Sequence, residues 1–508
     1  MNRQPTIINK FGNWLAGVGR SLAVGRSLAV AGSYSSTGTG RATQNWNPGN
    51  AAINALISEG GDPLRRQSRD LIRRNPWAGN ALEGFVSNTI GTGICPISQH
   101  PNQATRKRIM TAFAEWTDEA DSSGLTDFYG LQALAARTIF EAGEAIVRFR
   151  YRRDTDVMTV PLQLQLLEPE YLPFNEYRPV AGGVVRWGIE FDQIGRRRAY
   201  HMYREHPHEM QMFYPSMELV RVPADSVAHL FRPIRPGQHR GQPWLSAVML
   251  PLYELEKYDR AELVRKAVSA MITFFERDID GTGPVVFDGN EKDESGVDQT
   301  NLEPGSYVKL PMGKTVEMAE PSDVGGMYSE FMRVQLMKIA AGCGMPVEVL
   351  SGDLSKVNYS SIRAGLLEFR RRLEMFQHQV VVHQFCRPTW KHWIKASALS
   401  GALDATDVNA NMRDYLRVEW QPPAWPWVDP LKDIQAEVVA IDNLLKARSQ
   451  TIRQSGYDAV EVDQMQYEDQ QREEKLKLKR RAVNGQEVAA APAEQKFASD
   501  GSQVDNAD

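Results

Sequence analysis

Three long stretches of this chain place apolar residues at helical spacing, and they constrain the fold more than any other feature. In residues 245–276 the apolar positions include Leu252, Leu263 and Phe274, and this repeat predicts one long helix. At about 1.5 Å per residue, that helix would be roughly 48 Å long. A second helix is expected over 325–341. Apolar stripes of this length must be buried, either within the chain or against another copy.

The third stretch repeats its apolar residues at alternating steps of four and three. Its members are Ile362, Leu366, Phe369, Leu373, Phe376 and Val380. This a/d repeat is typical of a seam between two helices, and we prefer that interpretation to a ligand-binding site.

The insert between the first two helices, residues 277–322, differs in composition from its flanks. Turn sequences surround short segments that we expect to be strands, VVFD, SYVKL and KTVEM, and ten acidic residues face only four basic ones. We expect a small acidic knob that docks partner proteins, although some of its carboxylates could instead face a channel. The candidate docking residues are Asp288, Glu291, Asp293, Glu294 and Asp298.

Residues 50–243 mix helical and strand signals, which makes the fold class α+β and mainly helical. Asp62-Pro63 and Asn75-Pro76 each resemble a helix start, with a capping side chain before proline. Strands are expected at 145–152, 184–192 and 198–205, where apolar and β-branched residues lie between turns.

A polar loop, residues 346–360, interrupts the helices where a compact domain needs no loop, and such loops are usually functional. Met345-Pro346 is expected to end the helix before it. Asn358 or Ser360 is expected to cap the helix after it.

The two ends of the chain are poor in core-forming patterns. Residues 1–49 contain the identical tandem hexapeptides Gly19–Val24 and Gly25–Val30, and we expect a flexible arm there and a disordered tail over 484–508. Residues 420–430 (WQPPAWPWVDP) are expected to be a strand end and stiff linker. Asp429-Pro430 then starts a series of helices.

Composition excludes several classes of protein. The formal net charge of −4 argues against an electrostatic DNA clamp. Three widely spaced cysteines, Cys95, Cys343 and Cys386, suggest neither disulfides nor a zinc site, and favour assembly in a reducing compartment. No apolar run approaches the roughly 18 residues that a membrane span needs, and a signal peptide is not expected.

Motifs for catalysis are weak, so we expect no enzyme, cofactor or metal. Met312–Thr315 ends in Gly-Lys-Thr, but the P-loop glycine five residues before Gly313 is missing. His201, His206, His208 and Glu209 crowd together without metal-ligand spacing, and we expect surface or strand-end roles for them. Asp353 has no histidine or second carboxylate nearby in sequence.

Four segments, in order and spacing, carry a family resemblance: Gly188–Pro207, Val227–Val248, Gly342–Gly365 and Ser455–Asp469. They resemble the portal proteins of lambda-type tailed bacteriophages. The resemblance implies a ring, normally a dodecamer, at one capsid vertex of the virion, assembled in the host bacterial cytoplasm. It implies that double-stranded DNA passes through non-specifically during packaging and ejection. The implied partners are the terminase large subunit, the major capsid protein and head-completion or tail adaptor proteins.

The resemblance also implies an assignment of the chain to the parts of a portal. The expected parts are the wing (50–243), stem helix 1 (244–276), clip (277–322), stem helix 2 (323–345), channel loop (346–360), a long wing helix with a strand and linker (361–429) and a helical crown (430–483).

The channel loop would touch DNA weakly, because strong phosphate contacts would slow translocation. Its candidate residues are Ser351, Gly352, Asp353, Ser355, Lys356, Asn358 and Tyr359. Two alternatives remain: a minor-capsid or scaffold-type adaptor without a channel, and a nuclease or maturation protease built on the histidine cluster.

Overall fold

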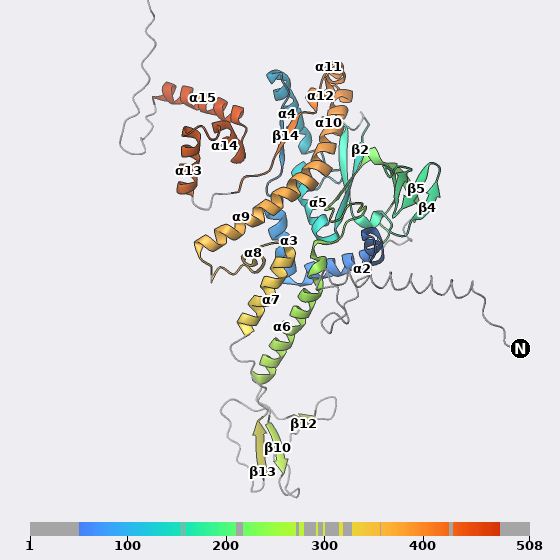
Figure 1. The fold of residues 1–508 in the computed structure, drawn as a ribbon, viewed down its shortest axis with the longest axis vertical. Coiled ribbons are helices and arrows are strands. Elements are labelled where there is room, and N and C mark those ends of the chain that lie inside the picture. The colour runs from blue at the N-terminus through green and yellow to red at the C-terminus, as the bar shows by residue number, and fades with distance from the viewer. Residues whose placement is uncertain are drawn as a thin grey trace, which may run out of the picture. The chain divides into compact units, whose positions relative to one another are not determined.

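The computed structural model describes residues 50–153, 156, 158–209, 217–270, 328–355, 357–425 and 430–477, with four short strands between 274 and 318 (Figure 1). The predicted arm, the VVFD and SYVKL strands and the C-terminal tail lie outside these residues. The chain divides into two compact units, 1–62 with 233–240, and 63–232 with 241–508.

Helices make up most of the described chain. They are α2 (Ile53–Arg74), α3 (Pro76–Thr89), α4 (Gln103–Thr117), α5 (Phe128–Ala142), α6 (Met249–Ala270), α7 (Tyr328–Cys343), α8 (Val347–Ser351), α9 (Tyr359–Phe376), α10 (Arg387–Ser400), α11 (Ala405–Ala410), α12 (Met412–Tyr415), α13 (Pro430–Asp442), α14 (Arg448–Gln454) and α15 (Ala459–Leu476). A π-helical segment, η7 (Gln377–Cys386), joins α9 to α10, and short 3-10 turns occupy η3 (Pro169–Tyr171), η4 (Ala224–Ser226) and η5 (Trp244–Ala247).

The strands form small antiparallel sheets. A three-stranded sheet has the order β3-β2-β9 and a five-stranded sheet the order β4-β5-β6-β7-β8, while β1 pairs with β14, β10 with β13 and β11 with β12. Their bounds are β1 (Cys95–Ser98), β2 (Glu144–Tyr151), β3 (Leu162–Leu167), β4 (Tyr177–Val180), β5 (Gly183–Arg186), β6 (Ile189–Asp192), β7 (Arg197–Tyr203), β8 (Leu219–Pro223), β9 (Val227–Phe231), β10 (Phe274–Asp278), β11 (Glu291–Lys292), β12 (Asp298–Gln299), β13 (Lys314–Met318) and β14 (Val418–Gln421).

The predicted first long helix is shorter than expected at both ends. Residues 244–247 form a 3-10 turn and α6 begins at Met249, so that Pro251 falls in the first turn, where a proline needs no N–H partner. Phe274, assigned from the sequence to this helix, lies in β10 and pairs with Met318. Aromatic residues such as Phe274 fit a strand well.

The prediction that Asp62-Pro63 opens a helix is wrong. α2 runs continuously through Pro63, although proline there lacks the N–H that would bond to the preceding turn. By contrast, Asn75 caps α3 as predicted, accepting hydrogen bonds from the N–H groups of Trp77 and Ala78.

The predicted strand at 184–192 is in fact a hairpin of β5 and β6. Trp187 and Gly188, the two residues of its turn, have φ angles of 53° and 75°. Both residues of a type I′ hairpin turn require positive φ, and tryptophan rarely supplies it. Local sequence preferences therefore do not predict this turn.

The larger core lies between helices and one face of the three-stranded sheet. Phe85 of α3 is at its centre, with ring centroids 5.1 Å from Phe140, 4.7 Å from Trp244 and 5.2 Å from Phe376. The predicted a/d seam contributes here, because Phe369, Leu373, Phe376 and Val380 are all buried. The seam is therefore packed against this chain's own core.

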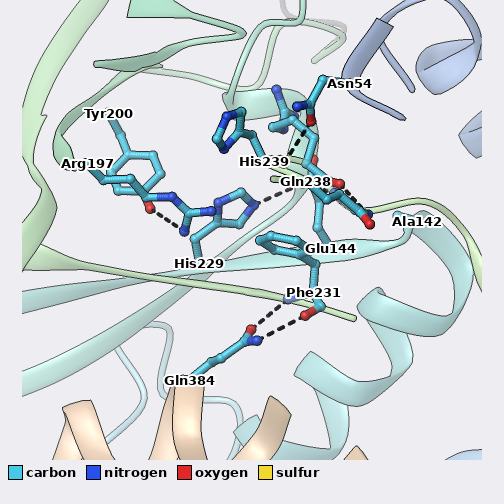
Figure 2. Close-up of polar contacts among 12 residues, drawn as sticks. Asn54, Ala142, Glu144, Arg197, Tyr200, His229, Phe231, Gln238, His239 and Gln384 are labelled. Carbon is cyan, nitrogen blue, oxygen red and sulfur yellow. Dashed lines mark hydrogen bonds and ion pairs between the residues drawn. The ribbon is translucent and has the colours of Figure 1, made fainter. Parts of the chain in front are cut away.

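The π segment η7 is attached to the end of an edge strand. The carboxamide of Gln384 accepts from the Phe231 N–H at 2.9 Å and donates to the Phe231 carbonyl at 3.1 Å (Figure 2). One side chain thus satisfies both peptide groups of Phe231 as a neighbouring strand would.

A buried charged cluster lies where two backbone segments cross. A Cβ on Gly241 would lie 2.1 Å from the Gly143 carbonyl oxygen, so only glycine allows this approach. Beside the crossing, the Glu144 carboxylate is paired with Arg65, lies 2.9 Å from His229 Nε2 (Figure 2) and accepts the Gly241 N–H at 2.7 Å. Each partner offsets part of the cost of burying this charge.

A second polar cluster lies on the outer face of the five-stranded sheet. Glu190 of β6 is 4% exposed and accepts hydrogen bonds from Arg221 at 2.8 and 2.9 Å. His201 of β7 lies 3.1 Å from the same carboxylate and receives Arg178 Nη2 on Nδ1 at 3.0 Å. These contacts, the Arg221 hydrogen bonds first, lower the pKa of Glu190 to about 2.

This pKa predicts a defined acid dependence of stability. The stabilisation by ionised Glu190 should be complete above its ordinary pKa of 4.5 and be lost as the pH falls towards 2. The thermal midpoint of the wild type should therefore exceed that of Glu190→Gln near neutral pH, with the gap closing below pH 4.5. Glu115→Gln, at an exposed position of α4, is the control. A gap that stays constant with pH would contradict this account.

Candidate functional site

The segment between α7 and α9 folds differently from the single loop that the sequence predicted. α7 ends before Gly344, which has a φ of 75°, so Met345-Pro346 does not terminate it. Pro346 instead precedes α8, a five-residue helix. The open loop is therefore shorter than predicted and begins at Gly352, which caps α8 with a φ of 71°.

Helix α3 holds α8 in place. The Asn80 side chain donates to the carbonyls of Val349 and Leu350, each at 2.8 Å, and Leu350 is completely buried. A Cβ on Gly84 would lie 2.9 Å from a Val349 methyl group, so the two helices approach closely only because this residue is glycine. These supports were missed because about 270 residues separate the partners, beyond any local pattern.

The loop organises its own polar groups. Ser351 ends α8 and donates to the Val347 carbonyl at 2.7 Å, while its hydroxyl accepts the Asp353 N–H at 3.2 Å. Asp353 in turn accepts the Ser355 N–H at 2.9 Å. The predicted loop position of Ser351 is thus wrong, and its hydroxyl already has two partners. Leu354, which the sequence did not single out, is 61% exposed.

The far end of the loop is set by Asn358. Its side chain accepts the Ser361 N–H at 2.9 Å and caps α9, which confirms one of the two predicted caps. Tyr359 is the first residue of α9 and not part of the loop. Lys356 lies outside the described residues. Among the predicted loop residues, Gly352, Asp353, Ser355 and Asn358 lie together in one exposed segment.

Helices α6 and α7 pack on each other and retain an apolar surface. The Tyr328 hydroxyl donates to Asp259, and this bond raises the pKa of Tyr328 to about 12. The rings of Tyr258 and Phe331 lie 4.8 Å apart. The exposed apolar residues, which we call the stem stripe, are Leu263 (63%), Val264 (58%), Phe331 (43%), Val334 (50%) and Met337 (40%).

The candidate docking residues of the insert are described only in part. Glu291 lies in β11 opposite Gln299, and Asp298 lies in β12 opposite Lys292. Asp288, Asp293 and Glu294 lie outside the described residues. The Lys-Thr pair of the P-loop-like motif begins β13, which pairs with β10; a P-loop lysine would instead precede a helix.

The histidine cluster does not converge on one site. His201 is buried against Glu190, so the expected surface or strand-end role is wrong for this residue. His206 instead lies beside Glu168 and Glu170, with ligand atoms within 4.8 Å of one another. Arg69 already donates to Glu170 at 2.8 Å and lies 3.5 Å from Glu168. Both carboxylates that a metal ion would require are thus already paired with one guanidinium.

Comparison with known proteins identifies the family to which this chain belongs. The family model described as phage portal protein, lambda family, matches residues 39–377. The chain belongs to the lambda family of phage portal proteins. Portal function and a place in the phage virion follow, and the family is a structural one.

Individual relatives agree with this family. The chain is 27% identical over 433 residues to the "Probable portal protein" of Halomonas phage phiHAP-1, covering 83% of this chain and 82% of the relative. It is 20% identical over 466 residues to "Portal protein B" of Escherichia phage lambda, covering 84% and 86%.

A solved structure described as the neck of a native GTA particle, computed with C12 symmetry, is similar at 13% identity and a TM-score of 0.45, covering 79% of this portal protein and 98% of that chain. Among the helices of the described ranges, none has both the length and the apolar character needed to cross a membrane.

The Asn358 cap predicts a local effect on the loop. Asn358→Ala should cost about 1 kcal/mol of helix stability, because an N–H in the first turn of α9 loses its acceptor. Hydrogen exchange measured by mass spectrometry should become faster in peptides covering the start of α9. Asn358→Ser, which retains a capping oxygen, should exchange nearly as the wild type does. Equal exchange in the wild type and Asn358→Ala would contradict the cap.

Proposed function

We propose that copies of this portal protein close into a ring of twelve, as is usual in the family, around a channel for double-stranded DNA. A terminase motor would package DNA through this channel, and the DNA would leave through it at ejection. The observation that carries the proposal is the stem stripe, in which five large apolar side chains on two packed helices remain 40–63% exposed in the single chain.

The energetics of the stem stripe favour contact with another copy. Large apolar side chains that are scattered singly are normal on a surface, but a contiguous group marks an interaction site. Each such side chain gains about 1.5–3 kcal/mol when it is fully removed from water. In a ring, head-to-tail contacts between copies can cover one stripe per copy all the way round.

The helices assigned to the crown show a second exposed apolar row. In α13, Leu431, Ile434 and Val438 recur at steps of three and four and are 74%, 44% and 49% exposed, and Leu445, which follows the helix, is 82% exposed. These residues follow the same three-four rhythm as the buried seam in α9. A neighbouring copy would bury them in the same way.

The loop from Gly352 to Asn358 suits a channel lining that holds DNA loosely. Its two ends are fixed by the Gly352 and Asn358 caps, so its middle is presented from a stable base. Lys356 and Asp353 balance in formal charge. A lining without surplus positive charge avoids the strong phosphate binding that would resist movement of DNA.

The remaining assignments follow the family. The wing would contact the major capsid protein, and the crown would face the capsid interior. The clip, with Asp288, Glu291, Asp293, Glu294 and Asp298 as its docking residues, would receive the terminase large subunit and later the head-completion or tail adaptor proteins. Assembly would take place in the host bacterial cytoplasm. No reaction, cofactor or metal is assigned to the chain.

Ring assembly is tested by placing charge in the stem stripe. Leu263→Asp with Val334→Asp should abolish rings and leave folded monomers, because both side chains are already exposed within one chain. Light scattering coupled to size exclusion, with negative-stain images, reads out the result. Leu125→Asp, at a wing position that is 88% exposed, is the matched control. A wild-type protein that stays monomeric, or a double variant that still forms rings, would refute the proposal.

The channel loop is tested separately from the ring. Deletion of residues 352–358, or Lys356→Glu, should leave rings intact while empty or partly filled heads accumulate. Lys107→Glu, an exposed charge reversal in α4, should package normally. Full heads in the deletion variant would contradict the loop assignment. Particles without portal rings would instead favour a scaffold-type adaptor.

A further inference from the structure

Strand β2 presents a row of arginines on one face. Arg148 and Arg150 alternate with the core residues Val147 and Phe149. Arg152 follows the last residue of the strand, and its backbone N–H donates to the Pro161 carbonyl at 2.9 Å. Alternate residues of a strand lie about 7 Å apart on the same face. Arg148, Arg150 and Arg152, here called the arginine ladder, therefore follow one another on one face of the extended chain with a two-residue period.

The arginine ladder has no carboxylate partner among the described residues. Arg150 Nε donates to Gln165 Oε1 at 2.8 Å and Arg152 Nε donates to Gln163 Oε1 at 2.7 Å. Neutral amides thus orient Arg150 and Arg152 through Nε. The terminal nitrogens, which form the fork that grips carboxylates, remain available to a ligand.

Gln163, which orients Arg152, is itself held by two hydrogen bonds. Gln163 Nε2 donates to the carbonyls of Glu119 and Asp121, at 3.1 and 3.3 Å. The carboxylates of these two residues face elsewhere, because Glu119 accepts from Thr159 and Asp121 accepts from Ser123. The nearby acids are therefore already committed to their own loops, and the ladder is held in position without being neutralised.

Partial burial and repulsion between neighbouring guanidinium groups disfavour the charged state of the ladder arginines. Burial, followed by the neighbouring arginine, lowers the pKa of Arg148 and of Arg150. Like charges held in a row on a half-buried surface are unfavourable for folding. Residues that oppose stability in the isolated chain are common at binding sites, where the ligand supplies the missing interaction.

We propose that the arginine ladder is a docking site for an extended acidic segment of a partner protein, with carboxylates at every second residue. Such a segment has the same two-residue period and straightness as the row of guanidinium groups, so that successive carboxylates meet successive forks. A duplex fits less well. The phosphates of one strand follow a helical path around the duplex axis, which curves away from a straight strand.

The test uses the full-length protein and fluorescein-labelled peptides. The probe is a twelve-residue peptide of alternating glutamate and threonine, followed by fluorescence anisotropy at low salt. Its controls are the glutamine-threonine peptide and a block peptide with six glutamates followed by six threonines. Arg148→Gln with Arg150→Gln should weaken binding of the alternating peptide about tenfold or more, the loss expected for charge-assisted hydrogen bonds.

A matched double variant separates the site from general charge. Arg66→Gln with Arg196→Gln removes the same charge from exposed positions of α2 and the β6–β7 turn, and should change binding less than about twofold. The ladder variant should also melt no lower than the wild type, since it relieves repulsion. A lower melting temperature would indicate a structural role and overturn the proposal.

Three further outcomes would overturn the proposal. The first is an equal loss of peptide affinity in both double variants. The second is equal binding of the block and alternating peptides. The third is binding of a 20-base-pair duplex that depends on the ladder, without binding of the acidic peptide. Tighter binding of the alternating peptide that is lost only in the ladder variant would support it.

Discussion

The burial of Glu144 at a crossing of two glycine backbones is the constraint on which the rest of the larger unit depends. Gly143 and Gly241 allow the end of α5 and the segment that leads to α6 to touch backbone to backbone. Glu144, completely buried beside them, is reached by Arg65 from α2 and by His229 from β9. Removing one partner from a buried charge costs about 3–5 kcal/mol. The central strand β2 and the segment that leads to α6 are thereby fixed to one point.

Much of the local structure could be predicted, because its causes lie within a few residues of one another. The a/d repeat through Phe376 identified a buried seam, and Asn75 and Asn358 cap the helices that follow them. The failures also have physical reasons. Pro63 is tolerated inside α2, and Trp187 adopts a positive φ that its side chain disfavours. In both cases the tertiary structure overrides a local preference.

The candidate site was predictable in position but not in detail. The polar composition of the loop and the caps at its ends predict its position. Helix α8 could not be predicted, because Asn80 and Gly84, which hold it, are distant in sequence. For the arginine ladder, the sequence pattern of residues 145–152 predicts only a strand. Its lack of acidic partners depends on where Gln163, Glu119 and Asp121 point, and no sequence pattern records that.

The same apolar spacing has two different outcomes in this portal protein. In α9 the stripe is buried against α3 within the chain, while in α6, α7 and α13 apolar residues remain exposed. Periodicity therefore predicts that a helix has a partner, but not whether the partner belongs to the same molecule. A lone chain in water leaves these surfaces unsatisfied, which gives association between copies a hydrophobic driving force.

The carboxamide of Gln384 protects the edge strand β9 against pairing with a strand of another molecule. An open edge strand can recruit a strand from a neighbouring polypeptide and start fibril growth. Both peptide groups of Phe231 on β9 are already occupied by this one side chain. In the proposed ring, contacts between copies therefore cannot use β pairing at this position, and helical surfaces would form them instead.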